Sequence, residues 1–332
     1  MTDWTAAAAI IDRNLALEAV RVTEAAAIAA SREIGRGDER AADLAAMKAM
    51  RSALSTLEFD GTIVIGEGEE GEADMLYVGE KIGTGRIGAP IDIALDPLEG
   101  ATICAKGAQN AVAVVAMAER GGFFSPPMVY MDKIAVGPHL PPGVVDLDEP
   151  PARNLKNLAR DKDMEVSDLL VCMLDRPRHE ELIAKVREAG ARVMLINDGD
   201  VSGAIATAHP DSGVDMYLGS GGAQEGVLAA AALACVGGQM QGRLLLRSDD
   251  ERALARRRGI VDFTRRYELS DMAKGDIMFA ATGVTDGALL RGVRRFRGGA
   301  VTHSIVLRAK SGTVRSIEAQ HRLDHFGEVF GE

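Results

Sequence analysis

Apolar residues along the chain occur in two patterns, at helical spacing and in short continuous or alternating runs. Between residues 14 and 34, apolar side chains recur every three or four positions, which predicts an amphipathic helix that ends before Gly35. Runs of β-branched and aliphatic residues that are bounded by glycine or proline predict short strands. The expected helices are 14–34, 38–54, 73–82, 180–189 and 223–236, and the expected strands are 61–65, 91–95, 111–118, 169–174, 192–196, 301–308 and 313–317.

Prolines suggest where the chain divides. Seven of the 11 prolines fall between Pro126 and Pro151, and such a stretch is typical of a connection between domains. A length of 332 residues also favours about two domains. We therefore expect an N-terminal lobe of residues 1–138 and a C-terminal lobe of residues 139–332. Beyond the boundary, predicted strands and helices alternate, which indicates βαβ layering and an α/β fold.

Composition excludes several classes of protein. The formal net charge of −11 disfavours nucleic-acid binding, because that affinity depends on lysine and arginine displacing counterions. The longest apolar run, Val227–Val236, is too short to cross a membrane, and the N-terminus lacks the basic region of a signal peptide. The three cysteines are widely spaced and show no CxxC pattern. We therefore expect a soluble cytoplasmic enzyme that binds neither nucleic acid nor a membrane.

One glycine pattern imitates a dinucleotide site. The segment Gly66–Gly71 reads GEGEEG, which matches GxGxxG, and it follows a predicted strand. Its three carboxylates would repel the pyrophosphate that such a turn must hold. Arg86 also stands about where an acidic ribose partner is expected. A nicotinamide cofactor is therefore not expected.

Acidic residues gather where predicted strands end. Glu67 follows one strand and a glycine, while Asp96 and Glu99 follow the next strand. Pro97 fixes its own backbone φ angle, so a turn can direct both carboxylates to one side. Neighbouring carboxylates favour a cation between them, and hard oxygen ligands suit Mg²⁺ or Mn²⁺. Such a cation is consistent with a phosphate-ester substrate. The residues alone leave open both metal binding and ordinary turn acids.

Glycine- and acid-rich motifs run in order from about residue 14 to about residue 322. They are Gly35–Asp38 with Asp43, Asp60–Glu69, Gly79–Arg86, Asp96–Gly100, Tyr130–Lys133, Arg176–His179, Asp198–Asp200, Gly221–Gly226 and Gly242–Arg243. Together they resemble the class II fructose-1,6-bisphosphatases of the lithium-sensitive sugar and inositol phosphatase superfamily. The resemblance implies a layered α/β/α/β/α sandwich. It also implies hydrolysis of the 1-phosphate of fructose 1,6-bisphosphate to fructose 6-phosphate by metal-activated water, in gluconeogenesis.

The resemblance assigns roles to acidic residues. Asp43, Glu67, Asp96, Glu99 and Glu225 match the metal-binding positions of the family, for Mg²⁺ or Mn²⁺. Asp43 and Glu225 also match catalytic positions, and Asp43 would help to orient or deprotonate the attacking water. Without the resemblance, Asp43 fits an ordinary helix acid and Glu225 an ordinary acid in the first turn of a helix.

Substrate-binding residues are implied in the same way. Two arginines that flank a proline suit the 6-phosphate, because guanidinium groups bind phosphate in a bidentate manner. From the residues alone, Arg176 and Arg178 could equally form ion pairs at a helix start. The DGD segment at Asp198–Asp200 could equally be an ordinary turn, and Tyr130 could equally be a packed aromatic. The matching positions are Glu99, Gly100, Ala101, Tyr130, Arg176, Pro177, Arg178, Asp198, Gly199, Asp200 and Gly222.

Position 101 departs from the family pattern. The family carries threonine directly after Asp-Pro-x-Glu-Gly, and its hydroxyl group is thought to assist the nucleophilic water; here the residue is Ala101. Either Thr102 reaches in from the next position or catalysis is impaired, and we expect the second. Two other readings stay open, a sedoheptulose 1,7-bisphosphatase (or inositol phosphatase) and a non-catalytic sugar-phosphate-binding relative. A homo-oligomer, a dimer or a tetramer, is expected from the family.

Overall fold

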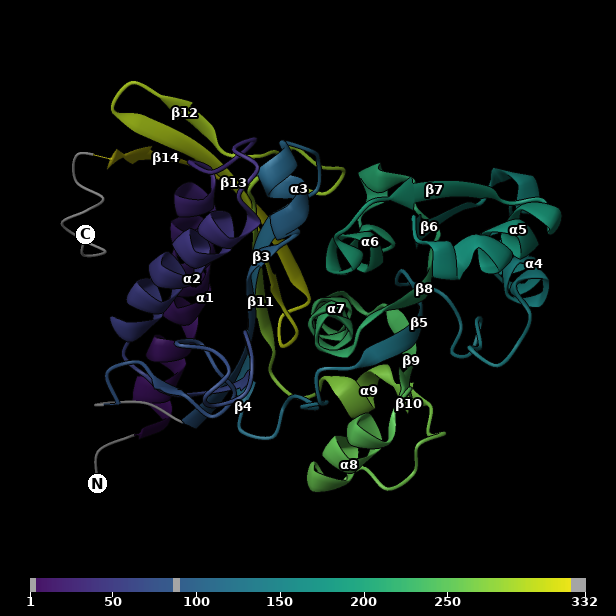
Figure 1. Ribbon diagram of the computed structural model, residues 1–332, viewed down its shortest axis with the longest axis horizontal. Helices are drawn as coiled ribbons and strands as arrows, with labels where there is room; N and C mark the ends of the chain where they lie inside the picture. Colours follow the sequence, from purple (N-terminus) through teal and green to yellow (C-terminus); the bar gives the residue numbers. More distant parts are fainter. Residues whose placement is uncertain (1–3, 86–89, 324–332) are drawn as a thin grey trace. The chain divides into compact units, whose positions relative to one another are not determined.

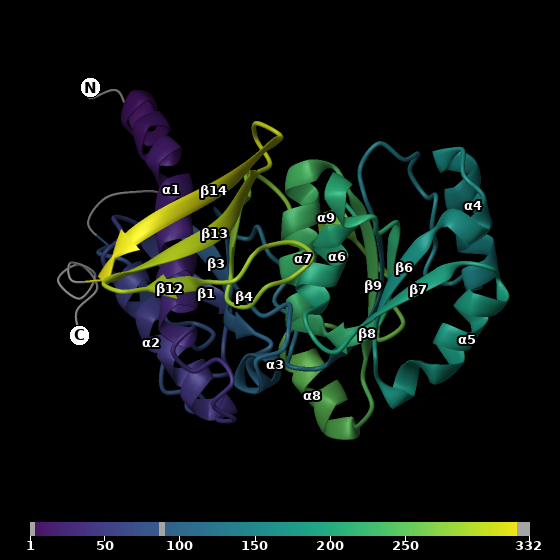
Figure 2. The same cartoon turned by 90° about the horizontal axis from the view of Figure 1, so that it is seen from above.

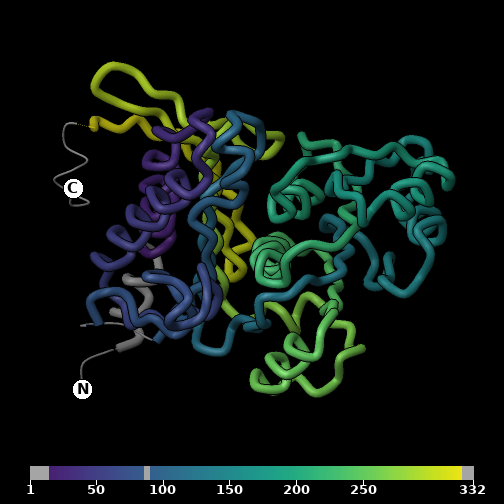
Figure 3. The backbone as a smooth tube through the Cα atoms, viewed as in Figure 1, coloured from purple at the N-terminus to yellow at the C-terminus, as the bar shows by residue number. Residues whose placement is uncertain are grey.

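Two compact units make up the chain. The computed structural model describes residues 4–85 and 90–323, with side chains from residue 15 onward (Figure 1). The first unit combines Met1–Phe123 with Gly275–Glu332, and the second is Phe124–Lys274. The backbone trace shows the purple N-terminal and yellow C-terminal segments together in the first unit (Figure 3). This division differs from the expected boundary at residue 138. Arg86, at the end of one sequence motif, lies outside the described residues.

A mixed sheet forms the base of the first unit. Its elements are α1 (Trp4–Ala30), α2 (Glu39–Ser55), β1 (Asp60–Ile65), β2 (Lys81–Ile82), β3 (Pro90–Glu99), α3 (Ala101–Lys106), β4 (Val112–Glu119), β11 (Met278–Gly283), β12 (Arg294–Phe296), β13 (Gly299–Arg308) and β14 (Thr313–Arg322). Among the described residues the sheet has eight strands, in the order β12-β13-β11-β4-β3-β1-β2 with β14 also paired to β13. Strands β1 and β3 are parallel, and the other neighbouring pairs are antiparallel.

Helices α1 and α2 pack on each other and against this sheet (Figure 2). Asp38 caps α2 by accepting the backbone N–H of Ala41 at 2.9 Å, which satisfies one of the open N–H groups at the helix start. Ala26, Ala46 and Met50 are fully buried in the shared core. The small side chains allow close packing of the helices. Both expected helices are present: α2 closely matches the expected 38–54, whereas α1 ends at Ala30, four residues before the expected end.

The helix expected at residues 73–82 is wrong. The segment forms turns and then the short strand β2. Leu76 and Gly79 adopt positive φ angles of 56° and 98°, which a right-handed helix does not contain. The buried carboxylate of Glu80 accepts the backbone N–H of Leu76 and the Nε–H of Arg51, so side-chain bonds hold the turn in place.

A buried polar network joins α1 to the C-terminal strands. The Thr302 hydroxyl donates to Glu24 Oε1 at 3.2 Å and lies 2.8 Å from His321 Nε2. Burial raises the pKa of Glu24 to about 7 and lowers the pKa of His321. Glu24 is therefore mostly protonated below about pH 7, and the lowered pKa of His321 favours its neutral form, although His321 Nε2 lies only 3.8 Å from Glu24 Oε1.

Replacing Glu24 with glutamine is expected to flatten the pH dependence of stability between about pH 4.5 and 7. The folded pKa of about 7 exceeds the ordinary 4.5, so the folded state holds the proton more tightly. Protonation of Glu24 therefore stabilises the folded state by about 3 kcal/mol at pH values below the ordinary pKa. This stabilisation is lost as the pH rises through the folded pKa. Denaturant unfolding of both proteins across this range measures the difference. Equal slopes in the two proteins would contradict it.

The second unit contains a separate sheet. Its elements are β5 (Tyr130–Val136), α4 (Pro151–Lys162), η1 (Val166–Asp168), β6 (Leu170–Leu174), η2 (Pro177–His179), α5 (Glu180–Glu188), β7 (Arg192–Ile196), α6 (Asp200–Ala206), η3 (Pro210–Ser212), β8 (Met216–Gly222), α7 (Ala223–Val236), β9 (Gln239–Leu245), α8 (Asp249–Arg257), β10 (Tyr267–Glu268) and α9 (Leu269–Met272). Among the described residues, the strand order is β10-β9-β5-β8-β6-β7. Only β6 pairs in parallel here, with β7 and with β8. Two mixed sheets with packed helices confirm the expected α/β class.

Side chains on β5 alternate between the two faces of this sheet. Ile134 and Val136 join the hydrophobic core that includes α4 and α5. Met131 and Lys133 point to the opposite face, where a Cβ on Gly226 of α7 would lie 2.8 Å from Met131 Sδ. This alternation separates two groups of polar residues at the start of β5.

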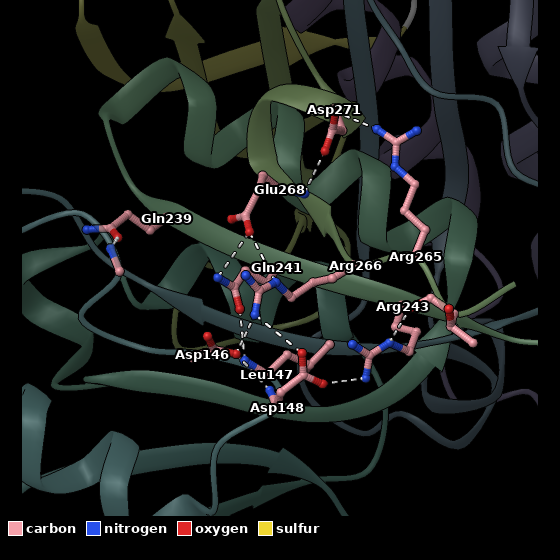
Figure 4. Close-up of polar contacts among 12 residues, drawn as sticks. Asp146, Leu147, Asp148, Gln239, Gln241, Arg243, Arg265, Arg266, Glu268 and Asp271 are labelled. Atoms are coloured by element: carbon pink, nitrogen blue, oxygen red, sulfur yellow. Dashed lines mark hydrogen bonds and ion pairs between the residues drawn. The ribbon is translucent and has the colours of Figure 1, made fainter. Parts of the chain in front are cut away.

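Charged side chains fasten the proline-rich stretch to β9 and its neighbours (Figure 4). Arg243 on β9 pairs with Asp148 at 2.7 Å, and Arg266 lies 3.4 Å from the same carboxylate. The Gln241 side chain accepts the backbone N–H of Leu147 at 2.8 Å. The stretch is therefore an ordered part of the second unit. None of the described helices is long and apolar enough to cross a membrane.

Candidate active site

Two parallel strands carry acidic residues to one edge of the first sheet. Ile65 pairs with Ala94 in the register of β1 and β3. Glu67 and Asp96 each lie two residues beyond this pair, so both lie towards the carboxyl ends of the two strands, at the same edge of the sheet. Strand β3 continues to Glu99 instead of ending at Leu95 as expected, and Glu99 is buried. The sequence thus located this acidic edge, but not the full length of the strand.

A left-handed glycine follows Glu99. Gly100 has a φ of 94° and forms the N-cap of α3, whose first residue is Ala101. This conformation is costly for other residues and explains the glycine at this position. Ala101 is half-buried and lies two residues from Glu99, so a side-chain hydroxyl at this point would lie close to the acidic edge. Asp43, on α2, is half-buried in the same unit, and burial raises its pKa. Helix α2 packs against both β3 and α3.

The turn that carries Glu67 is tightly packed. The backbone N–H of Glu67 donates to Leu76 O at 3.0 Å, and that of Val78 donates to Gly68 O at 2.9 Å. A Cβ added to Gly66 would lie 2.0 Å from Leu76 O, a backbone atom that cannot rotate away. The loop at residues 73–80 therefore fixes the position of Glu67.

Replacing Gly66 with alanine is expected to lower the free energy of unfolding by about 1–3 kcal/mol, because the backbone must shift to admit the methyl group. The shift would also move Glu67 and weaken the binding of divalent cations. Gly68→Ala is the matched control, since the nearest atom to its Cβ would be Ala73 Cβ at an ordinary 3.4 Å. Urea unfolding and Mn²⁺ titration measure both effects. Equal losses in the two variants would contradict the expectation.

Arginine side chains of the second unit lie near the end of β8. Pro177 begins the short helix η2, and the Arg178 guanidinium donates to the Ser220 carbonyl at 2.8 Å and hydroxyl at 3.1 Å. His179 is buried; its Nε2 accepts the Ser220 N–H at 2.9 Å, and its Nδ1 lies 2.9 Å from Leu174 O. Because a carbonyl only accepts, Nδ1 carries the proton and the ring is neutral. Burial also lowers the pKa of His179. This histidine therefore holds Ser220, which holds Arg178.

The aspartates of the DGD segment begin α6. Arg176 Nη2 lies 3.7 Å from Asp198 Oδ1, a loose ion pair. Gly199 has a φ of 89° and precedes Asp200, the buried first residue of the helix. Glycine is required at this N-cap because the chain turns through the left-handed region. The sequence-predicted sugar-binding carboxylates thus stand at one turn, with Arg176 beside the first of them.

A buried lysine joins this group and was not predicted from the sequence. Lys133 is 1% exposed; its ammonium group pairs with Asp200 and donates to the Gly222 carbonyl at 2.9 Å. A Cβ on Gly221 would lie 2.0 Å from Asp200 Oδ2, and one on Gly222 would lie 1.8 Å from Glu225 Oε2. Only glycine leaves room for these carboxylates against the strand. The available signal was a lysine inside the apolar strand β5.

Glu225 lies in the first turn of α7, close to the Asp200 carboxylate and the Lys133 ammonium group. Burial raises its pKa, and the nearby carboxylate of Asp200 raises it further, while the Lys133 ammonium group opposes both effects. A carboxyl group in this setting is stabilised in its charged form by a cation. It therefore has the electrostatic character of a functional residue.

The predicted residues fall into two sets. Among the described residues, no group of three or more His, Cys, Asp or Glu side chains is arranged to hold a metal ion. The donors at the edge of β1 and β3 are nevertheless carboxylate oxygens, the ligand type that Mg²⁺ and Mn²⁺ prefer. The first unit contains Asp43, Glu67, Asp96, Glu99, Gly100 and Ala101, and the second contains Tyr130, Arg176, Pro177, Arg178, Asp198, Gly199, Asp200, Gly222 and Glu225.

Comparison with known proteins identifies the family. A family model described as bacterial fructose-1,6-bisphosphatase, glpX-encoded, matches residues 13–321. The chain belongs to this family. Relatives include a protein named fructose-1,6-bisphosphatase 1 class 2 from Escherichia coli (strain K12) and one named fructose-1,6-bisphosphatase class 2 from Shigella flexneri. Each is 46% identical over 325 residues, which cover 94% of this chain and 96% of the relative. The resemblance to class II fructose-1,6-bisphosphatases, and with it the expected enzyme class, is confirmed.

Proposed function

We propose that this chain hydrolyses the 1-phosphate of fructose 1,6-bisphosphate, with Mg²⁺ or Mn²⁺ as cofactor, to give fructose 6-phosphate and inorganic phosphate. The observation that carries the proposal is the 46% identity, over 94% of the chain, to proteins named fructose-1,6-bisphosphatase. The acidic edge of β1 and β3 supports it, because carboxylates suit a divalent cation, and such a cation would neutralise the negative charge of the substrate phosphate.

In this proposal, acidic side chains hold the divalent cation. When bound, the cation neutralises phosphate oxygens and lowers the pKa of a water molecule. Asp43 orients the attacking water and accepts its proton at a carboxylate oxygen. The water oxygen then bonds to phosphorus, the bond from phosphorus to the sugar oxygen breaks, and that oxygen takes up a proton. The residues that would hold the cation are Asp43, Glu67, Asp96, Glu99 and Glu225.

Residues of the second unit would recognise the rest of the sugar bisphosphate. Guanidinium groups of Arg176 and Arg178 suit a phosphate group, and the Ser220 contacts already orient Arg178. Asp198 and Asp200 suit sugar hydroxyl groups, which donate hydrogen bonds to carboxylates. Gly199 and Gly222 allow the close approach of backbone to ligand that such a site requires.

Phosphate release from a panel of substrates tests the proposed function. The purified full-length protein is assayed with Mg²⁺ or Mn²⁺ on fructose 1,6-bisphosphate, sedoheptulose 1,7-bisphosphate and inositol 1-phosphate. Preferred hydrolysis of the first, abolished by a chelator and restored by the metal, supports the proposal. Preference for either of the others overturns the substrate assignment. A chelator-resistant activity overturns the cofactor assignment.

A non-catalytic sugar-phosphate-binding role is the second candidate, and Ala101 is the observation that favours it. If an Ala101→Thr variant also releases no phosphate, while fructose 1,6-bisphosphate still raises the melting temperature, this second role replaces the first. The assembly into a dimer or tetramer, the cytoplasmic location and the place in gluconeogenesis stay predictions. Size-exclusion chromatography with light scattering tests the assembly.

A further inference from the structure

One aromatic ring of the second unit contacts two arginines. The Cζ atom of Arg178 lies 4.9 Å from the centre of the Tyr130 ring, and the Cζ atom of Arg247 lies 4.4 Å from it. Both distances are those of cation–π contacts. Arg247 had no role in the sequence-based prediction of the site.

Strand pairing explains why Arg247 lies at this ring. Tyr130 pairs with Leu245 in the antiparallel register of β5 and β9. Arg247 follows Leu245 by two residues, so the alternation of side chains puts it on the same face as Tyr130. Its backbone N–H donates to the Glu251 carboxylate, which is part of the capping box of α8. The helix start therefore fixes the backbone from which Arg247 extends.

The guanidinium groups of Arg178 and Arg247 place two positive charges at the Tyr130 ring, and neither group forms an ion pair with a described acid. Among the described residues, no carboxylate lies within ion-pair distance of Arg178 or Arg247, whereas Arg243, on the same face of β9, pairs with Asp148 (Figure 4). Asp132, on the same face as Tyr130, is half-buried and has no ion pair among the described residues. Burial raises its pKa, while the charges of Arg243 and Arg247 oppose this effect. Two cations on one ring repel each other, so an anion with several acceptor oxygens would stabilise the pair.

We propose that Arg247, with Arg178 and Tyr130, binds the phosphate of a sugar bisphosphate that is not hydrolysed, and so selects bisphosphates over monophosphates. The proposal rests on the proposed function. Both arginines are exposed, but hydrogen bonds to Ser220 hold the Arg178 guanidinium group, so Arg247 is the more adjustable member of the pair. The Tyr130 ring positions both guanidinium planes and thereby reduces the conformational freedom that ligand binding must restrict.

Substrate selectivity of an Arg247→Gln variant tests this inference. The full-length protein is assayed on fructose 1,6-bisphosphate and on fructose 1-phosphate, which lacks the second phosphate. The ratio of the two kcat/KM values is expected to fall by about tenfold or more, because a charged contact to phosphate is lost. Arg247→Lys should recover part of the ratio. Arg252→Gln is the matched control, since Arg252 is an exposed arginine of α8 that pairs with Asp249 at 2.8 Å.

The outcomes separate this inference from the proposed function. A variant that loses activity on both substrates equally keeps the ratio of the wild type, which overturns the role of Arg247 and leaves the proposed function standing. A wild type that does not hydrolyse fructose 1,6-bisphosphate overturns the proposed function and the inference with it. If turnover of fructose 1-phosphate is too slow to measure, calorimetric Kd values for fructose 6-phosphate decide. A rise of about tenfold in Arg247→Gln, but not in Arg252→Gln, supports the inference, and an unchanged Kd overturns it.

Discussion

Replacing Ala101 with threonine is expected to raise kcat for fructose 1,6-bisphosphate by about 10²–10³-fold and to leave KM almost unchanged. Ala101 begins α3 directly after Glu99 and the left-handed Gly100, so its side chain lies close to the acidic edge of the first unit. A hydroxyl group there would position the attacking water in the transition state while contributing little to substrate binding. Effects confined to kcat are the signature of such a group.

Two further variants at this position identify the cause. Ala101→Ser supplies a hydroxyl group without the methyl, whereas Ala101→Val has nearly the shape of threonine without the hydroxyl. We expect serine to recover part of the gain and valine none. A gain in the valine variant would assign the effect to packing, and an unchanged kcat in the threonine variant would refute the catalytic role of position 101. Steady-state phosphate release measures all three.

Replacing Lys133 with methionine is expected to lower the free energy of unfolding by about 3–5 kcal/mol, because it leaves a buried carboxylate without its partner. The Lys133 ammonium group is the cation that pairs with Asp200, and it also donates to the Gly222 carbonyl. Without it, Asp200 and Glu225 face each other as desolvated acids. Denaturant unfolding, followed for each transition of this two-unit chain, measures the loss.

A double variant keeps this prediction testable if the single variant folds poorly. Lys133→Met with Asp200→Asn removes both charges, and we expect it to recover more than half of the lost stability. Lys185→Met is the matched control, because Lys185 pairs with Glu181 at 2.6 Å on the exposed surface of α5. Exposed pairs contribute about 0–1 kcal/mol. Similar losses of unfolding free energy in the Lys133 and Lys185 variants would show that the buried pair stabilises the protein no more than an exposed pair does.

Local sequence signals located much of the first unit. Asp38 marks the start of α2 through its capping bond, and the β-branched run before Gly66 forms β1. The final hairpin was also expected, and β13 and β14 pair over ten residues. Each of these elements depends on neighbours in the chain, so hydrophobic spacing and turn residues were enough to find it.

Side-chain bonds and contacts between segments distant in the sequence explain the failures. Leu76 and Gly79 lie in a segment with helical spacing, yet the carboxylate of Glu80 and the turn at Gly66 hold it as a loop. Lys133 could not be assigned from the sequence, because its partner Asp200 is 67 residues away. The site residues themselves came from a family resemblance, since single acids on helices and turns carry no distinctive local pattern.

The pairing of β4 with β11 has a consequence for synthesis of the chain. β4 ends at Glu119, whereas β11 begins at Met278, so this partner is translated only after all of Phe124–Lys274. On the ribosome, the contiguous second unit is complete in sequence while β4 still presents an open edge. Unpaired edges invite association between chains. A nascent chain that stalls before Met278 therefore exposes the apolar strand Val112–Glu119 to chaperones or to aggregation.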